Sequence, residues 1–222
     1  MEYEEVLKIR DQDVDGVSGW MWVKQDTGAW DGPHQEWMTS HRDAYLAASR
    51  ERNIVVQAGG NCGLYPRLFA KYFKTVYTFE PDPLNFHCLV NNCQLDNIVK
   101  INGALGANND MVRVRHSGLS NVGCHTIVTE GGECLVPQFT IDQLNLPACD
   151  FIQLDVEGYE KNVLQGAVKT IEKYKPGISC ENGNGNGILD FLAQYGYKPI
   201  TTVGADTIYT VEQITHLGAV IL

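Results

Sequence analysis

Short runs of apolar, β-branched residues alternate with longer segments that carry one apolar face along most of the chain. Such short runs are typical of parallel strands buried on both faces, and the longer segments have helical spacing. Strands that alternate with helices indicate a doubly wound α/β fold, which binds its ligand at the carboxyl ends of the strands. The predicted strands are 53–58, 75–79, 98–101, 150–155 and 177–181, and the predicted helices are 64–73, 82–95, 159–174 and 187–195.

The two ends and the middle of the chain depart from this alternation. Residues 1–37 contain all four tryptophans and several Gly, Asp and Pro turn signals, which predicts an N-terminal arm that packs on the main domain. Residues 38–50 have a helical pattern. The remaining predicted strands are pieces at 111–116 and 123–129 in a glycine-rich middle region, and closing strands at 197–202, 207–211 and 218–222.

A glycine turn after the first strand of the alternating region is the sharpest chemical feature of the sequence. Residues 55–63 read VVQAGGNCG, and Glu80 ends the next strand. Glycine lets the backbone approach a ligand, and a helix that follows such a turn offers free N–H groups. A carboxylate at the position of Glu80 accepts hydrogen bonds from ribose hydroxyls, so the two features together predict a nucleoside site. The alternative is an ordinary strand–helix turn beside a solvated glutamate.

The common nucleotide motifs do not fit this turn. The dinucleotide fingerprint G-x-G-x-x-G, started at Gly59, requires glycine where Asn61 and Leu64 stand. The chain also lacks the Gly-Lys-Ser/Thr of a P-loop and the Tyr-x-x-x-Lys of short-chain dehydrogenases. These differences count against a dinucleotide or an ATP site.

Several motifs in a fixed order resemble S-adenosylmethionine-dependent methyltransferases of the class I fold, and more narrowly the FkbM family. They are VVQAGGNCG at 55–63, FEPDP at 79–83 followed by Asn85, NGALG at 102–106, TID at 140–142, LDVEGYE at 154–160, LQGA at 164–167, Lys175-Pro176 and Glu181. The resemblance implies a Rossmann-like, mostly parallel sheet of seven strands. It divides the chain into an arm and helix at 1–50 and an S-adenosylmethionine-binding methyltransferase domain at 51–222.

The resemblance also implies which residues hold S-adenosylmethionine, with S-adenosylhomocysteine as the product. The family commonly has Asp or Glu where this chain has Gln57, and a neutral amide is a weaker partner for the cationic end of the cofactor. The predicted contacts are Gln57, Gly59, Gly60, Asn61, Gly63 and Leu64 around the amino-acid part, Glu80 at the ribose, Pro81, Asp82, Ala104 and Leu105 around the adenine, and Asp155 near the methyl group.

Acidic residues that follow the strand at 150–155 are the candidates for chemistry. Methyl transfer to an alcohol requires removal of the hydroxyl proton, which a carboxylate or a histidine performs. Asp155 and Glu157 are the predicted catalytic residues, whereas Glu160 is explained by the dipole of the helix that it begins. Asp155, Glu181 and Asn182 could together offer oxygen ligands to a divalent metal, although we expect no metal.

Two further features have plain structural explanations. His125 lies in the irregular middle region, and a lone histidine is more often a surface or packing residue than a catalytic one. His34, Trp30 and Asp31 lie in the arm, which covers a face of the sheet or closes over the ligand. We expect the arm to cover the sheet and the glycine-rich loop at 182–187 to be a turn.

Composition describes an acidic globular chain of 222 residues that is 44% hydrophobic. Its 17 Lys and Arg against 27 Asp and Glu give a net charge of −10, which disfavours binding to nucleic acid or to an anionic membrane. The seven cysteines are an odd number without a C-x-x-C pair, as is typical of reduced cytosolic thiols. The charged start does not resemble a signal peptide, and no segment approaches the ~18 apolar residues of a membrane span. We expect a cytoplasmic protein.

The sequence therefore predicts an S-adenosylmethionine-dependent methyltransferase that acts on a hydroxyl group of a sugar or small molecule. The hydroxyl preference comes from the family resemblance alone. The Asp/Asn-Pro-Pro-Tyr/Phe motif of base-amino methylases is missing where residues 155–158 read DVEG, which argues against a nucleic-acid substrate. Two alternatives stay open: a protein that binds the nucleoside without catalysis, and an NAD-type oxidoreductase.

Overall fold

The computed structural model describes residues 3–211, except 12, 15, 17, 28–33, 182, 184 and 186. The predicted strand at 218–222, Trp30, Asp31 and alternate residues of the loop at 182–187 lie outside the described residues. The side chains of residues 34–37 also lie outside them, so the prediction that His34 belongs to a covering arm is not tested.

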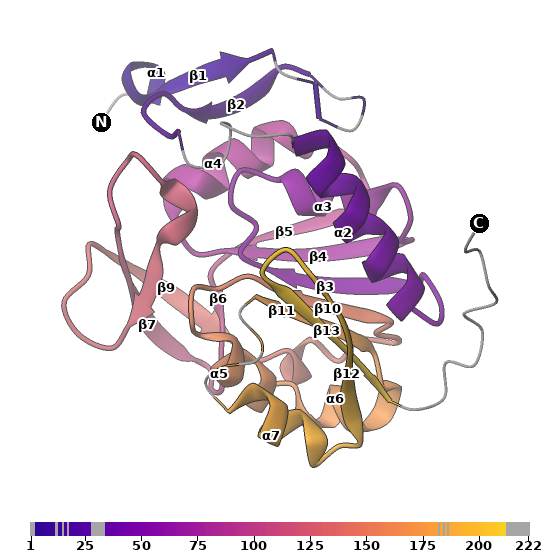
Figure 1. Ribbon diagram of the computed structural model, residues 1–222. Helices are drawn as coiled ribbons and strands as arrows, with labels where there is room; N and C mark the ends of the chain where they lie inside the picture. The colour runs from indigo at the N-terminus through magenta and orange to yellow at the C-terminus, as the bar shows by residue number, and fades with distance from the viewer. Residues whose placement is uncertain are drawn as a thin grey trace.

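A seven-stranded sheet forms the centre of the fold (Figure 1). Five neighbouring strands run parallel, and β13 is antiparallel to both of its neighbours. The predicted doubly wound, mostly parallel sheet is therefore confirmed. In spatial order the strands are β12 (Tyr197–Val203), β13 (Asp206–Val211), β11 (Gly177–Glu181), β10 (Phe151–Leu154), β3 (Ile54–Ala58), β4 (Thr75–Glu80) and β5 (Ile98–Asn102).

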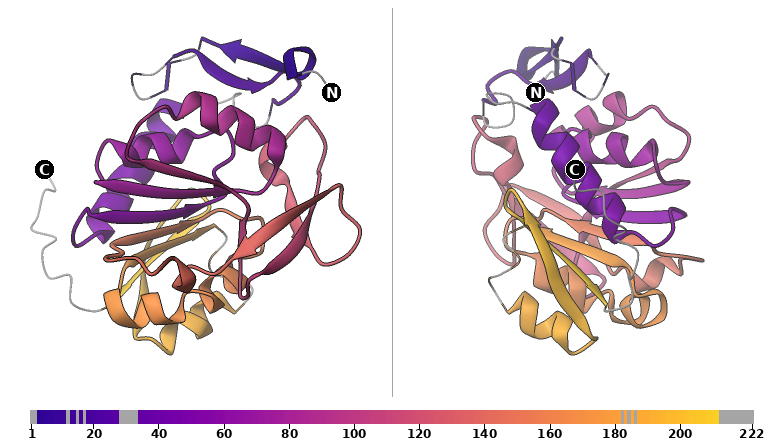
Figure 2. Two further views of the ribbon diagram at one scale, coloured as in Figure 1. Left: turned by 180° about the vertical axis from the view of Figure 1, so that it is seen from behind. Right: turned by 45° about the vertical axis from the view of Figure 1, so that its right-hand side comes forward.

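Helices cover both faces of this sheet, as Figures 1 and 2 show. Every residue of β3 is buried, because its side chains alternate between the two helical layers. Val55 packs in the core on one side, and Val56 packs in the core on the other. The first layer contains α2 (His34–Ala48), α3 (Leu64–Ala70) and α4 (Pro83–Asn92), and the second contains α5 (Glu160–Gln165), α6 (Val168–Tyr174) and α7 (Ile188–Ala193).

The single helix predicted at 159–174 is wrong, because the structure breaks it into α5 and α6. The backbone of Gly166 packs so closely on Gly106 that a side chain at this position would clash with the Gly106 carbonyl oxygen. Asp142, which lies outside α6, stabilises the start of that helix. Its side chain accepts hydrogen bonds from the backbone N–H groups of Lys169 (3.0 Å) and Thr170 (2.8 Å). These donors are among the unpaired N–H groups of a helix start, so Asp142 caps α6.

A smaller sheet of order β6-β9-β7-β8 projects from one side of the central sheet (Figure 1). Neither strand β9 nor the short strand at residues 104–105 was predicted. The strands are β6 (Ala104–Leu105), β7 (Asp110–Arg115), β8 (Thr126–Val128) and β9 (Cys134–Phe139), and two short 3-10 turns lie at η1 (Val122–Cys124) and η2 (Asp142–Leu144).

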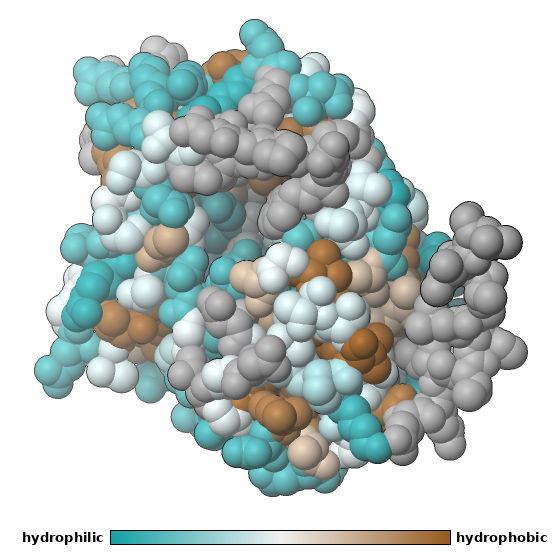
Figure 3. Space-filling model, in the orientation of Figure 1, coloured by the Kyte–Doolittle hydropathy of each residue, from teal (hydrophilic) through white to brown (hydrophobic). Residues whose placement is uncertain are grey.

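The N-terminal segment forms a short helix, α1 (Tyr3–Val6), and a hairpin of β1 (Leu7–Arg10) and β2 (Trp20–Val23). Trp20 and Trp22 are buried, and the backbone N–H of Met21 donates a 2.7 Å hydrogen bond to Asn92 at the end of α4. The hairpin therefore packs on α4 rather than on the strands. Within the described part of the chain, no helix has the length and apolar character needed to cross a membrane. Polar side chains dominate the face shown in Figure 3, where apolar ones form small separate groups.

Candidate active site

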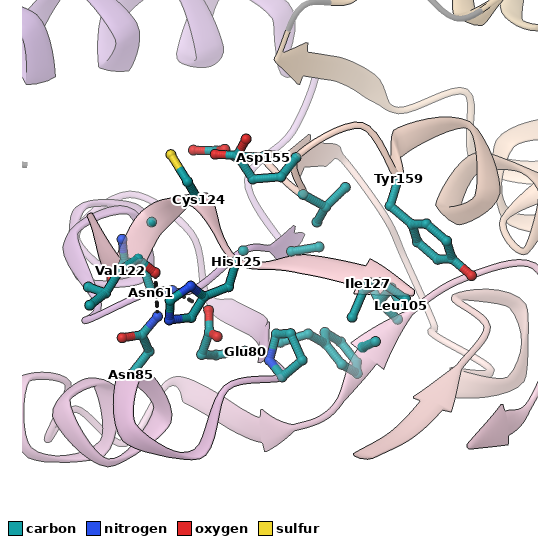
Figure 4. Close-up of a pocket in the computed structure, with 18 of the residues that line it drawn as sticks. Asn61, Glu80, Asn85, Leu105, Val122, Cys124, His125, Ile127, Asp155 and Tyr159 are labelled. Atoms are coloured by element: carbon teal, nitrogen blue, oxygen red, sulfur yellow. Dashed lines mark hydrogen bonds between the residues drawn. The ribbon is translucent and has the colours of Figure 1, made fainter. Parts of the chain in front are cut away.

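A cleft of about 250 Å³ opens at the carboxyl ends of β3, β4 and β10 (Figure 4). This is the edge at which doubly wound sheets bind their ligands. The segment from Asn121 to His125 forms part of its wall, and Ile127 of the small sheet also lines it. In Figure 4, polar side chains gather at one end near Glu80, whereas Leu105, Ile127 and Tyr159 lie at the other.

The glycine turn after β3 approaches the end of β10 very closely. Gly59 has φ +81°, and a side chain here would clash with the backbone oxygen of Asp155. The N–H groups of Gly59 and Gly60 both donate to the carbonyl oxygen of Phe79 on β4, at 3.1 and 3.0 Å. Glycine is therefore required at residue 59 by both backbone conformation and space.

Glu80 is held by backbone donors on both carboxylate oxygens. Oε2 accepts from the N–H of Asn61 at 2.7 Å, and Oε1 accepts from the N–H of Asp82 at 2.8 Å. The side chain is almost fully buried, and this burial raises the pKa of Glu80 to about 8 against the stabilising effect of those donors. Each oxygen retains a second lone pair that a ligand hydroxyl can use.

Three carboxylates meet at the ends of β10 and β11. Asp155, Glu157 and Glu181 each place an oxygen within 4.8 Å of the others. Burial raises the pKa of all three side chains, and nearby carboxylates raise it further: Glu181 and Glu157 act on Asp155, Glu157 acts on Glu181, and Glu160 acts on Glu157. Glu160 serves a different purpose, since its carboxylate accepts from the N–H groups of Val156 (3.3 Å) and Gly158 (3.2 Å) in the turn. The three carboxylates are suited to hold a proton or a positive charge.

The structure brings eight of the predicted site residues to the cleft and places five behind it. The residues on the cleft are Gly59, Asn61, Glu80, Pro81, Ala104, Leu105, Asp155 and Glu157. The residues outside its lining are Gln57, Gly60, Gly63, Leu64 and Asp82.

Two of these five support the cleft from behind. Gln57 is fully buried, where its Nε2 donates to the carbonyl oxygen of Gly59 at 2.9 Å and its Oε1 accepts from the Thr78 hydroxyl. Asp82 caps α4, because its Oδ1 accepts from the N–H groups of Leu84 and Asn85, each at 2.9 Å.

Sequence analysis missed the wall formed by Asn121 to Cys124 and the contribution of Asn85. The side chain of Asn85 is buried, its Nδ2 donates to the carbonyl oxygen of Val122 at 2.8 Å, and its Oδ1 has no partner. Oδ1 of Asn61 is also buried without a partner. Asn85 stood in the FEPDP-x-N motif, so its type and position were visible, whereas the wall depends on packing of the small sheet.

Acidic side chains line the cleft, without lysine or arginine among its described residues to pair with them. Its described lining residues include the carboxylates of Glu80, Asp155, Glu157 and Glu181 and no lysine or arginine. His125 also lies on the cleft, and burial lowers its pKa, which favours the neutral ring. Such a site favours a cation or a hydrogen-bond donor and disfavours a phosphate.

A profile of the FkbM methyltransferase domain matches residues 57–199, which is 143 of the 222 residues. The chain belongs to the FkbM methyltransferase family. This match confirms the family that the sequence motifs resembled. No curated protein matches the chain with significance.

One solved structure shares the fold of this FkbM-family chain at low sequence identity, and others are more distantly similar. An FkbM methyltransferase from Methylobacillus flagellatus is 18% identical with a TM-score of 0.51, and the match covers 78% of this chain and 51% of that one. This chain thus spans about half the length of that protein. A precorrin 8w decarboxylase from Methanobacterium thermoautotrophicum (TM-score 0.48, 14% identity) matches over 81% of this chain and 91% of its own. M. jannaschii TYW2 in complex with AdoMet (TM-score 0.44, 16% identity) matches over 93% and 87%.

Proposed function

We propose that this protein transfers the methyl group of S-adenosylmethionine to a hydroxyl group of a sugar or another small molecule. The observation that carries the proposal is the meeting of the glycine turn, Glu80 and the carboxylates of Asp155 and Glu157 in one cleft. When bound, S-adenosylmethionine supplies an electrophilic methyl group on a positively charged sulfur. A cationic sulfur, a ribose and an amino group are the features for which this set of acceptors is suited.

The residues present fit this cofactor better than they fit a dinucleotide. Glu80 offers acceptors to the ribose hydroxyls, and the unpartnered Oδ1 atoms of Asn61 and Asn85 offer acceptors to further hydroxyl or amino donors. Leu105 and Ile127 at the other end of the cleft offer apolar contacts to a base. The pyrophosphate of NAD would meet carboxylates and no lysine or arginine among the described lining residues. This charge distribution supports S-adenosylmethionine over NAD.

Asp155 and Glu157 would orient the acceptor and take its proton. The acceptor hydroxyl would donate a hydrogen bond to a carboxylate of this pair, and that carboxylate would take the hydroxyl proton during the transfer. A carboxylate whose pKa is raised toward neutral pH is a more effective base. Burial is the main cause of the raised pKa of both Asp155 and Glu157, and repulsion from Glu181 adds to it at Asp155. By holding the acceptor in one orientation, the same residues would also supply part of the rate.

The experiment that tests this proposal follows transfer of a labelled methyl group to a panel of hydroxyl-bearing sugars and small molecules, with amines as comparison. Asp155→Asn should lower the transfer rate by about 10²–10⁴-fold, while the protein still binds S-adenosylmethionine. Asp190→Asn, a change of an exposed acid on α7, should leave the rate unchanged. Binding of the cofactor without transfer to any acceptor would instead favour the non-catalytic alternative.

A further inference from the structure

A second group of metal-ligating side chains lies outside the cleft, where the small sheet meets the start of α4. Nε2 of His116 lies 2.8 Å from Oδ2 of Asp82 and 3.8 Å from Sγ of Cys134. All three atoms lie within 4.8 Å of one another. None of these residues lines the cleft, so this group is separate from the carboxylates of the candidate active site.

Two of these side chains lie at neighbouring ends of paired strands. Cys134 begins β9 opposite Val114 of β7, and His116 directly follows the last residue of β7. The contact between Nε2 of His116 and Sγ of Cys134 shows that the two side chains lie on the same side of the pair. The N–H of His116 donates a 2.9 Å hydrogen bond to Glu133, which holds this end of the pair in register.

The remaining constraints fix the imidazole and the carboxylate. The ring of His116 packs on the ring of His125 with 4.6 Å between their centroids. The two carboxylate oxygens of Asp82 have different partners: Oδ1 caps α4, and Oδ2 faces His116. A metal bound at Oδ2 therefore leaves the helix cap intact. Asp82 directly precedes α4, His116 directly follows β7 and Cys134 begins β9, so all three ligands lie at the ends of regular elements.

The geometry points to a divalent transition-metal site of the zinc type formed by Asp82, His116 and Cys134, with water as a fourth ligand. Thiolate, imidazole and carboxylate are the groups that bind zinc, and bond lengths of about 2.0–2.3 Å place tetrahedral ligand atoms about 3.4–3.6 Å apart. The Nε2–Sγ distance of 3.8 Å is close to this spacing, whereas the Nε2–Oδ2 pair at 2.8 Å must open slightly. The His116 side chain is 34% exposed, so the fourth position is open to solvent.

Metal binding would change the protonation of Cys134. Cys134 is a free cysteine, and its sulfur must lose the thiol proton before it can bind a metal. Binding of a divalent cation releases that proton to solvent and forms the metal–thiolate bond. The metal would join α4, β7 and β9, and so would stabilise the wall beside the cleft.

The test uses Co²⁺ and Zn²⁺ with the full chain, reduced and freed of metal by a chelator. We expect one metal ion per chain and a thiolate-to-cobalt charge-transfer band in the near ultraviolet. Cys134→Ser and His116→Gln should lose the band, and Zn²⁺ should raise the melting temperature of the wild type but not of these variants. Circular dichroism of the metal-free variants checks that they are folded.

Cys124→Ser is the matched control, because Cys124 is also a partly buried thiol beside carboxylates but lies on the cleft. The band should persist in this variant. The proposal is overturned if no band forms, if the band survives Cys134→Ser, or if only Cys124→Ser removes it. The proposal is also overturned if neither Co²⁺ nor Zn²⁺ binds at one ion per chain, because Asp82, His116 and Cys134 would then be a hydrogen-bonded cluster only.

Discussion

The backbone nitrogen of Asn61 lies 2.7 Å from Oε2 of Glu80, and this hydrogen bond joins the glycine turn after β3 to the carboxylate that ends β4. The neighbouring Gly59 and Gly60 donate to the carbonyl oxygen of Phe79 on the same strand. The turn and the acid are thus parts of one hydrogen-bonded unit. A change at either should alter the shape of the cleft as well as its chemistry.

The first prediction concerns the pH dependence of stability. The pKa of Glu80 is raised from 4.5 to about 8, so the folded state favours the protonated carboxyl. The stabilisation is fully present below the unfolded pKa of 4.5 and is lost as pH rises through about 8, by on the order of 5 kcal/mol at most. In Glu80→Gln, the free energy of unfolding should fall less between pH 5 and pH 8.5 than it does in the wild type.

Urea unfolding at several pH values measures this difference, and only the slopes are compared because the amide also changes the baseline. Glu172→Gln, which removes an exposed acid on α6, should keep the wild-type slope. Equal slopes for the wild type and Glu80→Gln would show that this carboxyl is not the source of the effect.

The second prediction separates a steric clash from backbone strain. Gly59 and Gly196 have nearly the same φ, +81° and +84°, but only Gly59 has a backbone atom where a side chain would stand. Gly196→Ala should cost about 1 kcal/mol through strain alone. Gly59→Ala should cost about 2–4 kcal/mol and abolish cofactor binding, because Asp155 must move. Thermal and urea unfolding of the two variants should therefore differ, and similar losses would contradict the close approach of the turn to Asp155.

The third prediction concerns the position where the family commonly has an acid. The Nε2 of Gln57 donates to the carbonyl oxygen of Gly59 inside the protein, and an ionised glutamate has no donor for that bond. Gln57→Glu should therefore cost about 1–3 kcal/mol at pH 7, with a larger loss at higher pH, and it should not tighten binding of S-adenosylmethionine. Urea unfolding and calorimetry check the two parts. Tighter binding at unchanged stability would place residue 57 against the cofactor.

The fourth prediction compares the cofactor with its product. S-adenosylmethionine carries a positive sulfur that S-adenosylhomocysteine lacks, and the carboxylates of Asp155, Glu157 and Glu181 would attract it. The cofactor should bind about tenfold more tightly than the product, equivalent to ~1.4 kcal/mol. Glu157→Gln should reduce this preference, whereas Asp190→Asn should retain it. Titration of each variant with both ligands measures the ratio, and an unchanged ratio in Glu157→Gln would remove that carboxylate from the account.

The buried strands could be predicted because their residues all face apolar surroundings. Every residue of β3 and of β10 is buried, and each strand is a mostly apolar run that includes one glutamine, so both could be recognised from the sequence. Strand β9 lacks such a run, since it lies in a smaller sheet where Leu135 is exposed and Val136 is buried. The break between α5 and α6 depends on Gly106 and Asp142, which are distant in sequence, so local periodicity extended one helix across it.

Some residues of the candidate site could likewise be predicted from the sequence, and others could not. Gly59, Glu80 and Asp155 follow or end parallel strands, so their meeting at one sheet edge follows from the topology. The segment from Asn121 to Cys124 reaches the cleft through the packing of the small sheet, and no local sequence pattern predicts that position. Gln57 was predicted to contact the cofactor because it lies next to the glycine turn. The sequence could not show that its side chain faces inward toward Thr78.

The central claim is that the cleft holds S-adenosylmethionine through Glu80. Its most direct test is isothermal titration of the protein with S-adenosylmethionine, with NAD as the comparison ligand and Glu80→Ala beside the wild type. The wild type should bind S-adenosylmethionine but not NAD, and a folded Glu80→Ala variant should lose cofactor binding. A folded wild type that binds no S-adenosylmethionine, or binds NAD instead, would contradict it.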